Sequence, residues 1–77
     1  MASVKKLIQK MKDQPNGIAF QEAYRVLEAR GYHFIRRNSS HCSFRNDSGD
    51  VITVVDSKDA IKKVYVVAIL ERIGETK

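Results

Sequence analysis

The chain has 77 residues, which allows one domain with a thin core and leaves no room for a second. Lys and Arg outnumber Asp and Glu by 14 to 9, and the net charge of +5 fits nucleic acid or an acidic protein as a partner, or simply a well-solvated surface. A single cysteine excludes an intramolecular disulfide, and no apolar run approaches the roughly 18 residues that span a membrane. Because Lys5 and Lys6 are not followed by a secretory h-region, we expect a cytoplasmic protein without membrane association.

Two amphipathic helices are predicted in the first part of the chain. Ser3 can cap a helix at about 3–12, whose apolar residues recur at helical spacing: Val4, Leu7, Ile8 and Met11. The Pro-Asn-Gly segment at 15–17 ends it. A second helix is predicted over about 20–30, with Gly31 as a left-handed C-terminal cap.

Short β-rich runs separated by turn residues follow these helices. Strands are predicted over 32–37, 41–46 and 51–55, with turns at 38–40 and 47–50 between them. Three strands in quick succession indicate an antiparallel meander.

The last segment, 61–73, is ambiguous. The β-branched run at 64–67 favours a strand by propensity. The segment is nevertheless long, Gly74 can cap it, and one helical face would carry Val66, Ile69, Leu70 and Ile73. We therefore predict a helix.

The predicted order α-α-β-β-β-α describes one α+β domain over 1–77, in which an extra N-terminal helix precedes a core at about 19–74. Helices would pack on one face of a three-stranded antiparallel sheet and leave its other face open. The core resembles the double-stranded-RNA-binding domain, which reads A-form RNA mostly by shape. That likeness concerns the fold and says little about function.

Alternation along the second strand predicts the side on which each of its residues lies. Phe44 suits the core together with Cys42, so His41, Ser43 and Arg45 should face outward. Arg36 and Arg37 on the preceding strand are expected to bring further cations near His41. An imidazole can exchange a proton with a ribose 2′-hydroxyl, and guanidinium groups can stabilise a phosphoryl group. A surface histidine among solvated arginines is the other interpretation, and chemistry alone favours it.

The stretch from Gly31 to Phe44, GYHFIRRNSSHCSF, resembles the signature of the HicA family: a Gly-aromatic start, a basic strand, Gly-Ser-His-His, and an aromatic residue two positions later. Segments 6–8 and 61–71 resemble the extra N-terminal helix and the C-terminal helix of longer members. HicA proteins are toxins of type II toxin–antitoxin pairs that cleave RNA and are neutralised by HicB antitoxins.

The resemblance implies an endoribonuclease that cleaves mRNA by metal-independent general acid/base catalysis at His41, with a HicB-type antitoxin as protein partner and no cofactor. Contacts to RNA or phosphate are predicted for Arg36, Arg37, Ser40, Arg45, Lys62 and Lys63. The two lysines begin the last predicted helix, where cations are unfavourable to the helix dipole.

Three positions differ from the family pattern. Ser39 replaces the signature glycine, Cys42 replaces the second histidine, and Val55-Asp56-Ser57 stands where the family has Pro-x-His. These differences favour an alternative function, a non-catalytic RNA- or protein-binding domain that has kept the fold. A pure protein-interaction module is a third possibility, because the basic surface would also suit an acidic antitoxin.

Other chemistry is less well supported. Cys42 and His41 would point to opposite faces of a strand, so a thiol nucleophile is disfavoured and a buried Cys42 preferred. No His or Cys spacing matches a metal site, and the segment 47–50 is too short for a calcium loop. We therefore expect no metal.

Overall fold

The computed structural model describes residues 3–75, so the outermost residues of the expected 1–77 domain lie outside the described part. Its elements are α1 (Val4–Asp13), α2 (Phe20–Ala29), β1 (His33–Asn38), β2 (His41–Arg45), β3 (Val51–Val55) and α3 (Lys63–Arg72). The predicted α+β order and the antiparallel meander β1-β2-β3 are confirmed.

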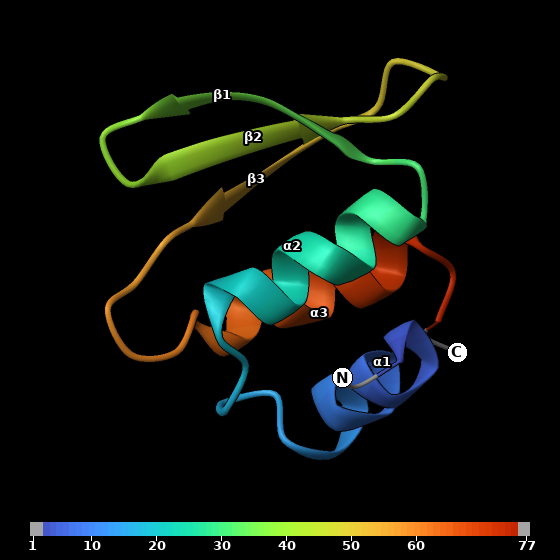
Figure 1. Cartoon of the computed structure of the whole chain (residues 1–77), viewed down its shortest axis with the longest axis vertical. Coiled ribbons are helices and arrows are strands. Elements are labelled where there is room, and N and C mark those ends of the chain that lie inside the picture. The colour runs from blue at the N-terminus through green and yellow to red at the C-terminus, as the bar shows by residue number, and fades with distance from the viewer. Residues whose placement is uncertain (1–2, 76–77) are drawn as a thin grey trace.

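The molecule consists of a sheet, a middle layer formed by α2 and α3, and α1 on the side of that layer away from the sheet (Figure 1). Helix α2 packs against β1 and α3 against β3, while α1 contacts α2 and α3 on the side away from the sheet. The core lies between these layers and includes Met11, Leu27, Cys42, Phe44, Ile52, Val54, Val66 and Ile69. All helices therefore lie to one side of the sheet, whose other face stays open.

Helix boundaries follow the local signals in the sequence. The Ser3 hydroxyl accepts a hydrogen bond from the Lys6 amide at 3.3 Å, which confirms the N-cap of α1. Gly31 has a φ of 89° just after α2, the left-handed conformation expected of a C-terminal cap.

The helical prediction for the last segment is confirmed, but the helix begins at Lys63 rather than at residue 61. Ile61 is buried, and its amide donates to the Ile18 carbonyl at 2.9 Å. This bond ties the loop before α3 to the loop before α2, and Lys62 is still extended as the N-cap of the helix, with φ −68° and ψ 146°.

Strand β1 contains a β-bulge at Ile35. Phe34 lies opposite Phe44, the next pair is Arg36 with Ser43, and Ile35 has no partner across the strand. The Phe34 ring packs against Phe44 on the helix side, with the ring centroids 5.8 Å apart. After the bulge, Arg36 points away from the helices and Arg37 points toward them.

A two-residue turn connects β1 to β2, because Asn38 pairs directly with His41. Ser39 has a φ of 59° and is the only non-glycine residue with positive φ in the described range 3–75. Positive φ at the first central residue of such a turn is the conformation that favours glycine.

Candidate functional site

The outward side of the sheet, here called the outer face, carries cations and, among the described strand residues, no carboxylate. The strand register places Asn38, His41 and Val55 in one row and Arg36, Ser43 and Thr53 in the next, with Arg45 and Val51 beyond. Cys42 and Phe44 are buried beneath. The predicted orientation of His41, Ser43 and Arg45 is therefore confirmed.

His41 is exposed and begins β2 directly after the turn. Arg36 is its diagonal neighbour across the strand pair, a position about 7–8 Å away that a long side chain can bridge. Among the described residues, neither side chain has a hydrogen bond or an ion pair. Both are therefore available to a ligand.

Arg45 lies at the opposite end of β2 from His41. The two residues are four positions apart on one strand, a separation of about 13 Å at a rise of about 3.3 Å per residue. Arg45 shares the outer face with His41, but the two side chains cannot grip the same phosphate group closely.

Arg37 was expected to bring a cation near His41, but it lies on the helix side of the sheet, opposite the face that carries His41. It pairs with the buried Cys42, and its Nη1 donates to an Asp56 carboxylate oxygen at 2.8 Å. This hydrogen bond raises the pKa of Arg37 above its usual value. Adjacent residues of a strand face opposite sides, so only one of the two arginines could join His41.

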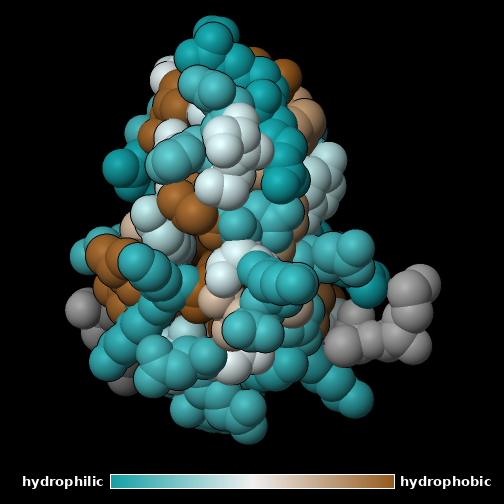
Figure 2. All heavy atoms as spheres, turned by 90° about the vertical axis from the view of Figure 1, so that its left-hand side faces the viewer, coloured by the Kyte–Doolittle hydropathy of each residue, from teal (hydrophilic) through white to brown (hydrophobic). Residues whose placement is uncertain are grey.

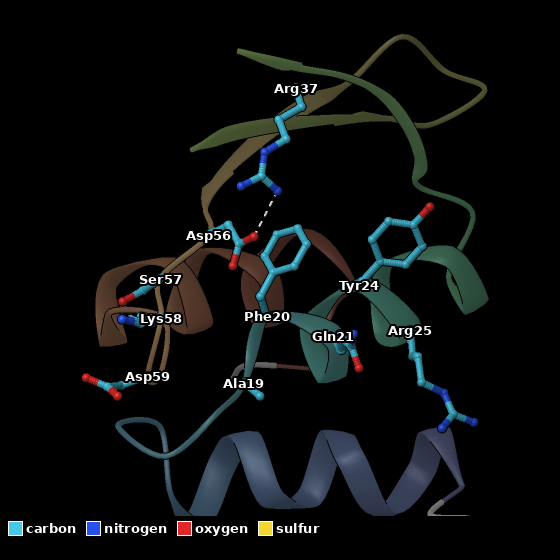
Figure 3. A pocket seen from close by; sticks show the side chains of 10 residues that line it. All are labelled: Ala19, Phe20, Gln21, Tyr24, Arg25, Arg37, Asp56, Ser57, Lys58 and Asp59. Atoms are coloured by element: carbon cyan, nitrogen blue, oxygen red, sulfur yellow. Dashed lines mark hydrogen bonds and ion pairs between the residues drawn. The ribbon is translucent and has the colours of Figure 1, made fainter. Parts of the chain in front are cut away.

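Arg37 and Asp56 together brace the turn that precedes His41. The Arg37 Nε donates to the Ser39 carbonyl at 2.8 Å, and the Asp56 amide donates to the Ser40 carbonyl at 2.7 Å. The same two residues are joined by their ion pair (Figure 3). The strained Ser39 conformation is thus held by two hydrogen bonds that end on the turn.

Lys62 and Lys63 are exposed at the start of α3, with Lys62 in the N-cap position. They belong to the end of the molecule where the β1–β2 turn also lies, at the left of Figure 1. They belong to the helix layer, so the sheet lies between them and the outer face. The structure therefore does not bring them beside His41.

An open hollow of about 690 Å³ lies between the turn and the helix layer. Phe20 and Tyr24 line it from α2, Arg37 and Asp56 from the sheet, and the segment 57–59 from the loop before α3 (Figure 3). On this side of the molecule, small apolar patches lie among mostly hydrophilic atoms (Figure 2). Sequence reasoning did not predict the hollow, because it forms where the loop at 57–59 passes α2, far away along the chain.

The described residues offer neither a metal cluster nor a membrane-spanning helix. Within residues 3–75, no three His, Cys, Asp or Glu side chains are grouped so that they could hold a metal ion. In the same range, every helix is too short or too polar to cross a membrane.

The comparison with known families matches most of the chain. The family model described as "HicA toxin of bacterial toxin-antitoxin" matches residues 20–75, which include α2, the whole sheet and α3. No curated protein and no solved structure matches significantly. The matched region contains the turn, His41 and the outer face. The chain therefore belongs to the HicA toxin family of bacterial toxin–antitoxin systems.

Proposed function

We propose that this toxin is an endoribonuclease that cleaves mRNA at His41 by general acid/base catalysis without a metal. The observation that carries the proposal is the position of His41, which is exposed on a face whose described strand residues include cations and no carboxylate. Its place in the signature-like stretch makes it the counterpart proposed for the family's catalytic histidine. A polyanion can approach such a face without repulsion. We further propose that a HicB-type antitoxin neutralises the toxin by covering His41.

Imidazole is the side chain whose charge changes nearest to physiological pH, which suits it to proton transfer in both directions. As a base, His41 takes the proton of the ribose 2′-hydroxyl while its oxygen attacks the adjacent phosphorus. As an acid, it donates a proton to the 5′-oxygen whose bond to phosphorus breaks. One histidine can serve either step, and a water molecule serves the other.

The proposed RNA contacts differ in their distance from His41. Arg36 is the guanidinium best placed to stabilise charge at the phosphate beside His41, because it is the diagonal neighbour. Arg45 would contact the RNA further along the outer face. Ser40, Lys62 and Lys63 would contact the backbone where it passes the turn, and Arg37 acts on RNA through the turn that it braces.

The test compares induced expression of the wild-type chain with His41→Ala and with His33→Ala at equal folded levels. His33 is the other histidine, also exposed but paired with Glu28 at 3.3 Å, and serves as the matched control. We expect mRNA decay and growth arrest from the wild type and from His33→Ala, and neither from His41→Ala. Cleavage that persists in His41→Ala would refute this role.

Metal independence is tested with purified protein and a chelator. Cleavage of a single-stranded RNA should be the same with and without the chelator. Loss of cleavage that returns with a divalent cation would contradict the metal-free mechanism while leaving the nuclease activity in place.

A non-catalytic RNA- or protein-binding domain is the second candidate. The observation in its favour is Asp56, which stands in the segment that replaces the family's Pro-x-His and neutralises Arg37 at 2.8 Å. This candidate predicts RNA that stays intact in the presence of the wild-type chain, with binding that weakens as salt increases. RNA decay that depends on His41 rules it out.

A further inference from the structure

The two edges of the sheet differ in how they are protected. Edge strands usually carry a bulge, a charge or a proline that discourages pairing with another chain. Strand β1 has the bulge at Ile35 and two arginines. Strand β3 reads Val-Ile-Thr-Val-Val, with five β-branched residues, no charge and no bulge.

The hydrogen-bond pattern shows which backbone groups of β3 are free. The Asn46 amide donates to the Asp50 carbonyl at 3.0 Å, and the Asp56 amide donates to the Ser40 carbonyl at 2.7 Å. Antiparallel alternation between these bonds directs the backbone groups of Ile52 and Val54 toward β2.

The backbone groups of Val51, Thr53 and Val55 therefore point to the open edge. The Val51 carbonyl accepts a bond from Arg72 at 3.3 Å. For Thr53 and Val55, no outward backbone bond to another described residue exists. Two amides and two carbonyls are thus available for a further strand, and so is the Val51 amide.

Exposed apolar side chains lie on the same side of the molecule. Helix α3 is contacted by α2, by β3 and by α1, so its remaining side faces the same way as the open edge. That side exposes Val64 by 63% and Val67 by 38%, whereas the Val51 side chain, which is 47% exposed, lies on the outer face. These two valines can extend a contact that is made along the open edge of β3.

The edge is complementary to itself. When a second copy is related by a two-fold axis through Thr53, Thr53 meets Thr53 and Val51 meets Val55 of the second copy. The two Thr53 residues can exchange both hydrogen bonds, and each Val51 amide can donate to the Val55 carbonyl of the other copy, while the Val51 carbonyl already accepts from Arg72. No like charges meet along the strand, because β3 has none.

We propose that this chain forms a homodimer in which two β3 strands pair antiparallel and the two sheets become one of six strands. The interface is isologous, with the same residues on both copies. Val64 and Val67 extend the contact at the level of the helices. This proposal does not depend on the proposed nuclease activity.

The dimer would join the two outer faces into one surface. Val55 lies beside His41 in one copy, and Val51 lies beside Arg45 in the other. The row would therefore run from His41 through Val55 and the second copy's Val51 to its Arg45. Three strand spacings of about 4.8 Å separate its ends, or about 14 Å. A single basic surface would then carry both histidines.

Sedimentation velocity on the full chain, from about 1 μM to about 1 mM, is the first test, because small interfaces associate in this range. We expect a change from monomer to dimer. Val51→Lys should weaken it by about tenfold or more, since a lysine on an edge strand discourages pairing. Ile35→Lys adds the same charge at a side chain of similar exposure, 49%, on the other edge and should have no effect.

Amide exchange identifies the contact itself. The amides of Thr53 and Val55 should exchange quickly in dilute protein and slowly in concentrated protein, whereas those of Ile52 and Val54 should be protected in both. Thr53→Pro removes an outward amide without removing a bond to β2. The variant should be folded by circular dichroism and monomeric by sedimentation velocity. The proposal fails if the chain stays monomeric up to about 1 mM, if Ile35→Lys disrupts the dimer as strongly as Val51→Lys, or if exchange at Thr53 ignores concentration.

Discussion

Arg36 and Arg37 are adjacent in the chain, yet they belong to two differently organised sides of the sheet. On the outer face, Arg36 and Arg45 have no ion pair with any described residue. On the helix side, Arg37 is neutralised by Asp56, and other cations there pair with carboxylates in the same way. Among the arginines of the strands, those on the outer face are therefore the ones without an ion pair to another described residue, and a partner can reach them there.

The largest expected effect is the difference in stability loss between a mutation on the helix side of β2 and a mutation on its outer face. Phe44→Ala removes a fully buried ring from the helix side and should cost about 3–5 kcal/mol, enough to unfold much of so small a domain. Its neighbour Ser43 faces outward, and Ser43→Ala should change stability by less than about 0.5 kcal/mol. Urea denaturation measures both. Similar losses of stability for the two variants would mean that the outer face contributes to stability as much as the buried side does.

The next effect concerns RNA binding by the two arginines. In a His41→Ala background that cannot cleave, Arg36→Gln should reduce the salt dependence of single-stranded RNA binding by about 0.7 for each phosphate that Arg36 neutralises. Arg37→Gln should leave that slope unchanged, because Asp56 already neutralises Arg37. Titrations at several salt concentrations decide the matter. A slope that falls equally for both variants would place Arg37 on the RNA.

A smaller effect is expected at the turn that joins the two sides. Ser39 adopts a φ of 59°, a conformation that costs a non-glycine residue about 1–2 kcal/mol. Glycine avoids this strain, but it also makes the unfolded chain more flexible, which offsets part of the gain in stability. Ser39→Gly should therefore stabilise the protein by about 0.5–1 kcal/mol, seen as a higher urea midpoint. Ser40→Gly, at a residue without positive φ, is the control and should give no gain.

The smallest effect is the pH dependence that ion pairs on the helix side impose. The Lys10 ammonium, followed by the Ala19 amide, holds the pKa of Glu22 below its ordinary value of 4.5. A carboxylate with a lowered folded pKa stabilises the protein above its unfolded pKa, and that contribution is lost as the pH falls through the folded value. Glu22→Gln should therefore flatten the loss of stability below about pH 4.5.

Glu71→Gln is the matched control, because Glu71 is exposed and has no ion pair with another described residue. It should leave the acid branch of the stability curve unchanged. If both variants flatten the curve equally, the Lys10–Glu22 pair has no special part in acid stability.

Much of the fold could be predicted from short-range patterns. Helical spacing located α1 and α2, and turn residues separated the three strands. At Val64 and its β-branched neighbours, propensity pointed to a strand, while the long apolar stripe and Gly74 pointed to the observed helix. The stripe prevailed because burying Val66, Ile69 and Leu70 stabilises the helix by more than its weak helix propensity costs.

The site was predicted less completely, because it depends on contacts between distant residues. Alternation gave the orientation of His41 correctly. The side taken by Arg37 follows from its pairing with Cys42 and from Asp56, which is 19 positions away. The hollow was missed because it needs the course of the loop at 57–59 over α2, which no periodicity encodes.

Because of the bulge at Ile35, β1 can lose one residue without a change in the pairing of its other residues. Deleting one residue from a strand normally turns every following side chain to the opposite face. Ile35 is the residue without a cross-strand partner, so its deletion would leave Phe34 opposite Phe44 and Arg36 opposite Ser43. A related sequence that lacks this one residue would thus keep the counterpart of Arg36 on the outer face. An alignment without gaps would instead match Arg36 with a residue that points to the helix side.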